Sequence, residues 1–471
     1  MELANVEVVG ALGIKRKADQ VTSAYQQVGS KELTQAANPN VVQSLAGKVS
    51  GLQINTTNSS VNSDSKVVLR GARSLSGSNE ALVVIDGAIS SLNVLQQISP
   101  DLIENVNVIK GAQGAALYGS DGVNGVIIVT TKKGQKGERF SVGINSSIDF
   151  TDVAYLPQTQ KRYGQGWDGL HSSFENGSWG PEFDGTMQPV GLIQADGTYF
   201  YAPYSATRNG IKDFFQTGKV YQTGINIAAG TLEDGYINFG ANRTVNEFIV
   251  PGDESKRNSF LLNARKKLGK FRVEANINYI TANSNQANNG TIQGGLYADL
   301  LQTPSNVPVT WFNHGNNENH WNVYYKNPYW TLKNKRQLNK QDRFQGNITL
   351  GYEINKNINV SYLASIRLFN SNSQTYNNGF VDTYSATYGA NAKSELSSYL
   401  KTSVYERNYY GDLMVNFNYM LTDDISFAAN IGNNLQDKRR EDLGAGGNNL
   451  DIPGWYNTDN VLTPFLSSQL N

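Results

Sequence analysis

Three histidines are the residues of this sequence best suited to metal or acid–base chemistry. His171, His314 and His320 all fall in segments predicted to be loops. The six-residue gap between the last two does not place them on one face of a helix, as a zinc-binding pair requires. Cysteine is absent from the sequence, so there is no thiolate ligand, disulfide or cysteine nucleophile. We therefore predict no metal site and no cofactor.

Catalytic motifs are also missing from the sequence. There is no G-x-S-x-G elbow and no P-loop, and the run GAQGAALYGSDGVNG (111–125) does not satisfy G-x-G-x-x-G. Asp86, in the run VIDG, has no second acid at a spacing suited to acid–base catalysis, so we interpret it as a structural turn residue. The sequence therefore predicts that the protein is not an enzyme.

Tryptophan residues in the long polar segments are candidates for ligand binding. Exposed aromatic rings can stack on sugar rings or peptide side chains, but they also pack loops together or lie at a membrane interface. The structural role is the more common one for any single residue, and ligand binding is the alternative. The candidates are Trp167, Trp179, Trp311, Trp321 and Trp330.

The composition limits the class of protein. The 471 residues include 40 Lys+Arg and 40 Asp+Glu, so there is no overall field to attract nucleic acid, which we exclude as a partner. The 46 glycines and 25 tyrosines, against 4 methionines, favour β-structure and turns. No apolar run approaches the roughly 18 residues of a membrane helix, and no signal peptide follows Met1. We expect a cytosolic chain or a mature or trimmed product.

From about residue 139 onward, apolar and polar residues alternate along long stretches. This period of two predicts strands with one dry and one wet face. We count about nine such stretches, several of them close to the ~9–11 residues that cross a bilayer. In FRVEANINYIT (271–281), one face carries Phe271, Val273, Ala275, Ile277 and Tyr279, and the other carries Arg272, Glu274, Asn276 and Asn278.

The connections between these strands alternate in length. Tight turns are predicted at LEDG (232–235), LGK (268–270), INKN (354–357) and LTDD (421–424). Long loops are predicted at 151–219, 285–338 and 371–404, with a shorter connection near 249–257. Short turns on one side and long loops on the other are typical of an outer-membrane β-barrel. A soluble sandwich remains the alternative, although its strands are usually shorter.

Residues before about 135 have a different, mixed α/β pattern. Asn38–Pro39 and Ser99–Pro100 each predict a helix start, with an N-cap residue followed by proline at the first helical position. The short apolar runs around them predict a small sheet, with strands at 66–70, 81–86, 105–109 and 125–131.

Four blocks of this first part, in this order, resemble the plug of the SusC/RagA family of TonB-dependent outer-membrane transporters. The blocks are VEVVGALGIKRK (6–17), LAGKVSGLQI (45–54), VVLRGARSLSGSNEALVVIDG (67–87) and IENVNVIKGAQGAALYGSDGVNGVIIVTTKKG (103–134). The later strands fit the barrel of that family more loosely.

The resemblance implies a plug domain inside an antiparallel transmembrane β-barrel of about 22 strands in the full protein, located in the bacterial outer membrane. Arg272 and its polar neighbours would face the lumen, because lipid exposure of such an Arg costs roughly 2–4 kcal/mol near the midplane. The implied organisation is an N-terminal segment and linker at 1–34, the plug at 35–138, and the first part of the barrel at 139–471.

The resemblance also implies site residues. A TonB-box-like segment at Val6, Glu7, Val8 and Val9 would bind TonB as an added strand. Structural plug positions are Arg70, Gly71, Asp86, Gly87, Gly111, Tyr118, Gly119, Gly122 and Gly125.

The implied function is import of a bulky oligosaccharide or oligopeptide, delivered by a SusD-like surface lipoprotein. One alternative is a non-transporting barrel that acts as a scaffold within a higher-order outer-membrane assembly or secretion complex. Another is a soluble β-rich binding module. The chain ends in PFLSSQLN (464–471) after an odd number of predicted strands, so we expect it to be a fragment of a longer protein.

Overall fold

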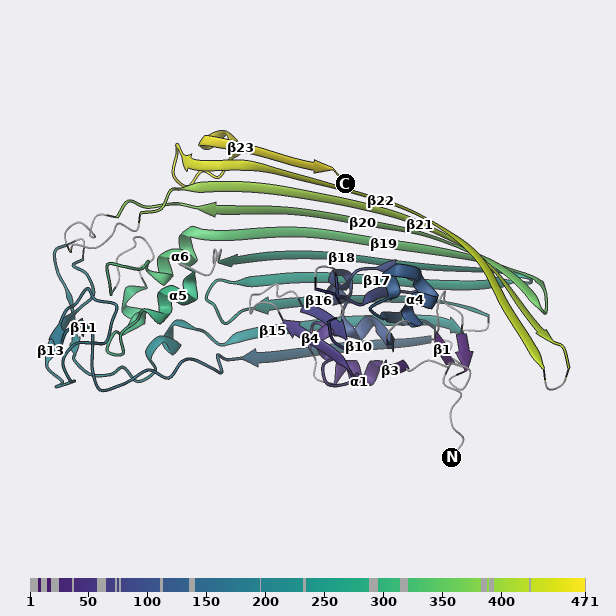
Figure 1. The fold of residues 1–471 in the computed structure, drawn as a ribbon, viewed down its shortest axis with the longest axis horizontal. Helices are drawn as coiled ribbons and strands as arrows, with labels where there is room; N and C mark the ends of the chain where they lie inside the picture. Colours follow the sequence, from purple (N-terminus) through teal and green to yellow (C-terminus); the bar gives the residue numbers. More distant parts are fainter. Residues whose placement is uncertain are drawn as a thin grey trace, which may run out of the picture.

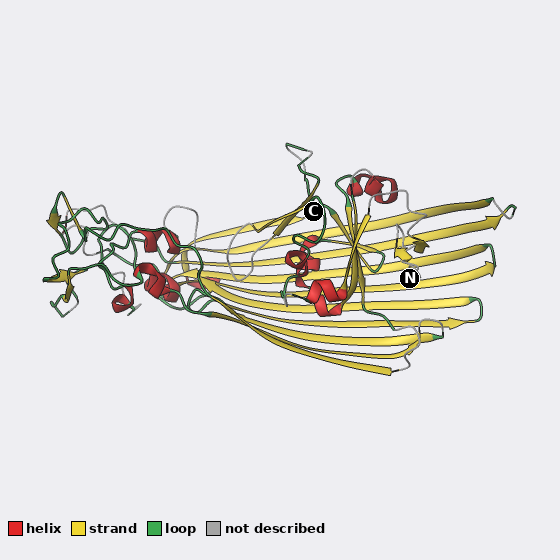
Figure 2. Cartoon of the chain, turned by 90° about the horizontal axis from the view of Figure 1, so that it is seen from below, coloured by secondary structure: helices red, strands yellow, loops and turns green. Residues whose placement is uncertain are grey.

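The chain folds into a large curved sheet with a small α/β unit against one of its faces (Figures 1 and 2). The computed structural model describes residues 7–9, 15–17, 25–35, 38–56, 65–72, 74–75, 78–110, 113–134, 140–194, 196–231, 234–287, 295–313, 321–382, 388, 394–422 and 425–470. No helix in these ranges has the length and apolar character needed to cross a membrane.

The large sheet has ten antiparallel strands. Each strand pairs with the strands of this sheet that come directly before and after it along the chain. The strands are β10 (Phe140–Thr151), β15 (Gly218–Thr231), β16 (Gly235–Glu247), β17 (Glu254–Leu268), β18 (Phe271–Ala287), β19 (Lys335–Asn355), β20 (Ile358–Asn377), β21 (Ser398–Met420), β22 (Ser426–Leu450) and β23 (Val461–Leu470). This architecture confirms the predicted antiparallel barrel wall.

The tenth strand corrects the expectation for the C-terminal segment. The sequence predicts that PFLSSQLN lies on a loop after an odd number of strands, but β23 pairs with β22 and includes Pro464 opposite Gly447. Proline and weak alternation conceal the strand in the sequence.

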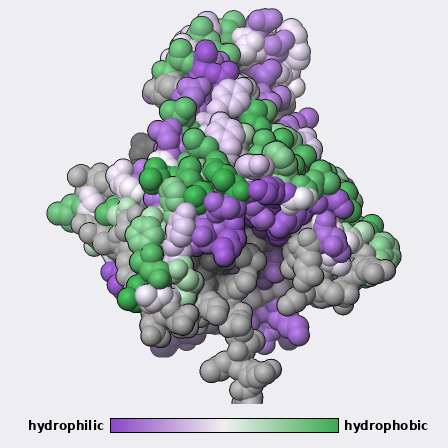
Figure 3. Space-filling model, turned by 90° about the vertical axis from the view of Figure 1, so that its right-hand side faces the viewer, coloured by the Kyte–Doolittle hydropathy of each residue, from purple (hydrophilic) through white to green (hydrophobic). Residues whose placement is uncertain are grey.

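Short and long connections lie at opposite ends of the sheet, as predicted (Figure 1). At the turn end, two to five residues separate β15 from β16, β17 from β18, β19 from β20 and β21 from β22. At the loop end, the long connections are 152–217, 288–334 and 378–397. Seen from the turn end, hydrophilic and hydrophobic residues lie next to one another at the surface (Figure 3).

The two faces of the sheet differ as the alternation predicts. On β18, Phe271 is 60% exposed on the outer face, whereas Asn276 and Asn278 are buried on the inner face. The inner polar groups bond to one another, and Asn276 Nδ2 donates to Asn263 Oδ1 at 2.8 Å. The predicted orientation of 271–279 is therefore confirmed.

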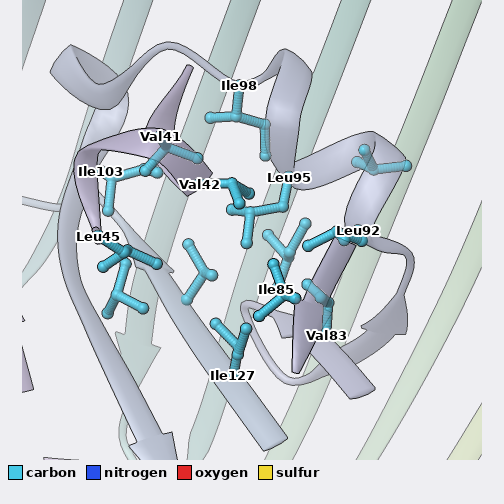
Figure 4. Close-up of a cluster of buried hydrophobic side chains, with 14 of the residues drawn as sticks. Val41, Val42, Leu45, Val83, Ile85, Leu92, Leu95, Ile98, Ile103 and Ile127 are labelled. Carbon is cyan, nitrogen blue, oxygen red and sulfur yellow. The ribbon is translucent and has the colours of Figure 1, made fainter. Parts of the chain in front are cut away.

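The α/β unit, the plug, has a five-stranded sheet in the order β3-β8-β9-β6-β7. Its strands are β3 (Tyr25–Gly29), β6 (Leu82–Ile85), β7 (Ala88–Ser90), β8 (Ile103–Ile109) and β9 (Val126–Thr131). Every residue of β9 is buried, which explains its continuous apolar run. Helices α1 (Ser30–Thr34), α2 (Val41–Ser44) and α3 (Leu92–Gln97) supply the facing side of a hydrophobic core (Figure 4).

The plug begins earlier than the predicted boundary at residue 35. β3 pairs with β8, and Val28 and Leu33 lie in the hydrophobic core. The first predicted helix start is also shifted, because Asn40 rather than Asn38 is the N-cap of α2 and accepts a hydrogen bond from the Val42 N–H. The Ser99–Pro100 start is a 3₁₀ turn, η3 (Pro100–Leu102).

Two glycines of the run 111–125 allow a close backbone contact. Helix α4 (Gln113–Tyr118) packs on the 3₁₀ turn η4 (Gly119–Gly122). A Cβ on Gly114 would lie 2.3 Å from the Gly122 carbonyl oxygen, and one on Gly122 would lie 2.2 Å from the Gly114 oxygen. These glycines are therefore required for packing, which agrees with the structural interpretation of the run.

Candidate functional site

The plug is attached to the inner face of the sheet through polar contacts. Arg257 on β17 makes the most extensive one, donating from Nη2 to the Pro39 carbonyl at 2.6 Å and from Nη1 to the Gln96 carbonyl at 3.2 Å. These carbonyls belong to the segment before α2 and to α3, so one guanidinium fastens two elements of the plug.

Asparagine side chains on the inner face make further contacts with the plug. Asn263 Nδ2 donates to Thr131 Oγ1 at 2.7 Å and to the Lys132 carbonyl at 2.6 Å. On β10, Asn145 Nδ2 donates to Asp101 Oδ2 at 2.7 Å. Further along the sheet, Arg343 Nε donates to Gln97 Oε1 at 2.9 Å. The plug is therefore bound across strands β10 to β19.

Few apolar groups cross this interface. Leu261 and Ile280 on the inner face of the sheet join the hydrophobic core of the plug, and both are at most 2% exposed. Because hydrogen bonds between polar groups exchange readily with water, an interface of this kind can separate without exposing a large apolar surface.

The plug positions predicted from the sequence lie mainly at turns. Asp86 has a positive φ of 47°, and its carboxylate accepts hydrogen bonds from the Thr131 N–H at 3.1 Å and the Thr131 hydroxyl at 2.6 Å. Arg70 also has a positive φ, and its N–H donates to the Gly51 carbonyl at 2.8 Å. Positive φ values also occur at Gly71, Gly87, Gly119 and Gly125.

These contacts favour structural roles for the turn residues of the plug. Tyr118 is the last residue of α4 and packs against the small cluster around Val84 and Val126. Gly111 lies outside the described residues.

The TonB-box-like segment forms a short strand, β1 (Glu7–Val9). It pairs antiparallel with β2 (Lys15–Lys17), with Val8 opposite Arg16. Only one edge of β1 is used in this pairing, and Val6 lies outside the described residues.

The long loops share a hydrophobic core of their own, at the loop end of the sheet (Figure 1). Trp321 is fully buried in this core, where its indole N–H donates to the Gln302 carbonyl at 3.0 Å and its ring lies 5.6 Å from that of Phe312. Trp330 is 3% exposed and contacts Phe380 edge to face. These two residues therefore pack the loops, which agrees with the structural role favoured from the sequence rather than with the alternative of ligand binding.

The other three predicted tryptophans remain accessible. Trp167, Trp179 and Trp311 are 62%, 69% and 45% exposed. Trp167 and Trp179 lie in the connection between β10 and β15, and Trp311 lies in the 3₁₀ turn η6 (Val309–Phe312). They stay candidates for ligand or partner contact.

A buried charged cluster joins the loops near helix α5 (Leu296–Leu301). Glu395 forms ion pairs with Lys326 and, at 3.1 Å, with Lys335. Asp299 is 1% exposed, and burial raises its pKa to about 7 despite the nearby lysines. No local sequence pattern indicates this cluster, because its members are far apart along the chain.

The described histidine does not form a metal site. His171 stacks edge to face on Tyr204, at 5.3 Å between ring centroids, and burial lowers its pKa. Within the described ranges no three His, Asp or Glu side chains are grouped so that they could hold a metal ion. His314 and His320 lie outside those ranges.

The inner-face residues that bind the plug were not singled out from the sequence. Arg257, Asn263 and Asn145 belong to the polar half of the alternation, which identifies the wet face but not the residues that meet the plug. Their contacts join positions more than 40 residues apart, for example Asn145 and Asp101 with a separation of 44.

The chain is similar to known proteins, both in one domain and in the sequence of its N-terminal part. Residues 17–126 match the family described as TonB-dependent Receptor Plug Domain. The TonB-dependent receptor SusC of Bacteroides thetaiotaomicron is 34% identical over 185 residues, which cover 38% of this chain and 18% of SusC. TonB-dependent receptor P39 of Formosa agariphila is 35% identical over 149 residues, covering 31% of this chain and 14% of P39.

Solved structures extend the similarity of fold to almost the whole chain. The RagAB peptide importer in its "open-open" state superposes with a TM-score of 0.73 at 17% identity, covering 98% of this chain and 53% of the RagAB chain. Its "closed-closed" state gives a TM-score of 0.71 at 17% identity, covering 96% and 52%. The chain thus spans about half the length of these solved chains.

Proposed function

Because the chain is a SusC/RagA-like TonB-dependent receptor of the bacterial outer membrane, carrying the plug and part of the wall, we propose that the full-length protein imports a bulky solute. The observation that carries this proposal is the plug, bound through exchangeable polar contacts to the inner face of the sheet. Such a stopper closes the lumen at rest and separates when it is pulled. We propose no enzymatic activity for the protein.

TonB would supply the pull through the N-terminal segment. β1 (Glu7–Val9) already has the extended conformation of a strand, and among the described residues only β2 pairs with it, which leaves its second edge for an added strand. Main-chain pairing of this kind transmits force along the backbone to β3, the edge strand of the plug sheet.

The N-terminal segment is tested by deletion of residues 5–10 from the full-length protein. Uptake of the solute should be abolished while binding at the cell surface is unchanged, because the ligand site and the coupling segment are separate. A control deletion of the same length, residues 153–158 in the mostly exposed loop that follows β10, should leave coupling intact. Persistent uptake after the first deletion would refute the assignment and favour a non-transporting scaffold.

The solute would be an oligosaccharide or an oligopeptide, handed over by a SusD-like surface lipoprotein. The folded loop core and the exposed rings of Trp167, Trp179 and Trp311 provide a large surface for such a partner. RagAB, whose chain shares this fold, is described as a peptide importer. Purification of the native complex in detergent would identify the partner and any retained solute. Recovery of assembly or secretion machinery in their place would contradict the proposal.

A further inference from the structure

A patch of charged side chains lies on the inner face of strands β19 to β22. Residues directly opposite on neighbouring antiparallel strands share a face, as do residues two positions apart along one strand. The registers align Arg343 with Phe369, Glu406 and Arg440, and the next inner row aligns Gln345 with Arg367, Asn408 and Lys438. The row on the other side aligns Gln341 with Ser371, Val404 and Asp442.

Contacts with the plug establish that this face is the inner one. Ser90 Oγ donates to Gln345 Oε1 at 3.3 Å, and Arg343 Nε donates to Gln97 Oε1 at 2.9 Å. A cavity of about 10 Å³, enough for about one water molecule, separates α3 from the wall beside Arg343 and Arg367. The patch therefore begins at the edge of the plug and continues along the open wall of β21 and β22.

The charges of this patch, which we name the lumen patch, do not balance. Four of its side chains are cationic, Arg343, Arg367, Lys438 and Arg440, and two are anionic, Glu406 and Asp442. Both carboxylates are used by Arg440, which pairs with Asp442 at 2.9 Å and with Glu406. At the turn end of the same face, by contrast, Arg265 and Arg272 share Glu274, at 3.2 and 3.6 Å.

Two cations of the patch retain binding capacity. The Nη1 atom of Arg367 is buried and has no hydrogen-bond partner among the described residues. Glu406 attracts Arg367 electrostatically, but its ion pair is made with Arg440. Lys438 is exposed, and no carboxylate in the described ranges lies within ion-pair distance of its Nζ. Lys438 can donate a charge-assisted hydrogen bond to an incoming carboxylate, and such bonds are stronger than neutral ones. Arg367 lies in the same inner row and adds positive charge beside it.

We propose that the lumen patch binds acidic groups of the solute as it passes the plug, so that the imported oligomer is anionic. This inference rests on the proposed function and adds a substrate class to it. Lys438 binds the acidic group directly, and Arg367, in the same inner row, strengthens this binding through its positive charge. Arg343 is already used: it donates to Gln97 of the plug, and its guanidinium lies 3.9 Å from the centre of the Phe369 ring on β20 of the wall.

The test is calorimetric titration of the purified full-length protein in detergent with two pairs of probes. One pair is an oligogalacturonate and its methyl ester, and the other is a glutamate-containing peptide and its glutamine isostere. We expect the acidic member of at least one pair to bind about tenfold more tightly than its neutral partner, and less tightly at high salt. The pair that responds identifies a saccharide or a peptide source.

Variants assign the effect to the patch. Arg367→Gln and Lys438→Gln should each remove most of the preference for the acidic probe. Lys438 is exposed, so its variant does not depend on repacking. Lys340→Gln is the matched control, because Lys340 carries the same charge on the outer face of β19. Equal binding of acidic and neutral probes, no binding of either acidic probe, or a preference unchanged in both variants would overturn the inference.

Uptake measurements separate this inference from the proposed function. If deletion of residues 5–10 stops uptake but the charge preference is absent, only the substrate class is wrong. If uptake persists after the deletion while the preference is present, the patch binds anions and the coupling to TonB is wrong.

Discussion

At the scale of single residues, Arg257 is the most connected link between the wall and the plug. Its two donor nitrogens reach carbonyls of separate plug elements, and a third contact at 3.5 Å joins it to Thr244 on the neighbouring strand. Hydrogen bonds to charged groups contribute roughly 1.5–3 kcal/mol each, and the carbonyls left behind would lack donors. Removal of this one guanidinium should therefore loosen a whole side of the plug.

We predict that Arg257→Met in the full-length protein weakens plug docking by about 3 kcal/mol, the lower end of what two such hydrogen bonds contribute, because methionine keeps most of the length but donates no hydrogen bond. Hydrogen exchange should accelerate in residues 39–45 and 92–98. Lys256→Met is the control, since Lys256 lies on the outer face in an exposed pair with Glu254. If hydrogen exchange in residues 39–45 and 92–98 is equally slow in the Arg257→Met and Lys256→Met variants, contacts other than those of Arg257 hold the plug.

At the scale of elements, the long loops form a folded unit rather than independent excursions. Their hydrophobic core includes Trp321, and the buried cluster of Asp299, Lys326, Lys335 and Glu395 joins α5 to the start of β19 and to the loop before β21. This cluster fixes the shape of the surface that a partner or ligand would meet. Its stability depends on pH, because one carboxyl has a pKa near neutrality.

We predict that the loop unit is less stable at pH 8 than at pH 5. Burial raises the pKa of Asp299 to about 7, above its unfolded value near 4, so the folded loops retain a proton that the unfolded chain releases. Stability therefore falls as pH rises from about 4 to 7. Lys326 and Lys335 outweigh burial and hold the pKa of Glu395 below its usual value, so this group stays ionised in the window.

Asp299→Asn should remove this pH dependence and protect α5 at pH 8. The measurement is hydrogen exchange of residues 296–301 at both pH values, corrected for intrinsic rates. The control is Asp196→Asn, an exposed loop carboxylate whose pKa is lowered by hydrogen bonds from Thr198. Wild-type protection that is equal at pH 5 and pH 8 would contradict the prediction.

At the scale of the whole molecule, the sheet separates two environments. Its outer face carries exposed apolar side chains such as Ile348, at 53% exposed, while its inner face carries polar groups and the plug. In the outer membrane the first face meets lipid and the second meets water or the plug. A charge placed on the outer face near the middle of the hydrocarbon layer should therefore be costly, whereas the same charge on the inner face should be tolerated.

We predict that Ile348→Arg destabilises the full-length protein in lipid vesicles by roughly 2–4 kcal/mol, because the guanidinium would enter the hydrocarbon layer. Ser361→Arg is the matched control on the inner face of β20 and should change stability by less than about 1 kcal/mol. The free energy of unfolding in urea measures both. Similar losses for the two variants would argue against a lipid-facing outer surface.

How far the sequence predicts this protein depends on the range of the interactions involved. Alternation in 271–281 predicts the strand and its faces correctly, since the period of two is a local consequence of strand geometry. The glycine run 111–125 likewise reveals a tight packing motif. Trp321 and Trp330 could not be assigned in this way, because burial depends on residues that only the fold brings together.

The sequence by itself determined the strand wall, the α/β plug and the likeness to SusC, because periodicity, turn residues and block order are properties of neighbouring residues. Tertiary structure alone decided which polar residues hold the plug, which tryptophans are buried, and that Arg343, Arg367, Lys438 and Arg440 form one patch. The physical reason is strand register. Hydrogen bonding across four strands aligns side chains that are up to 97 residues apart, and no local pattern records that alignment.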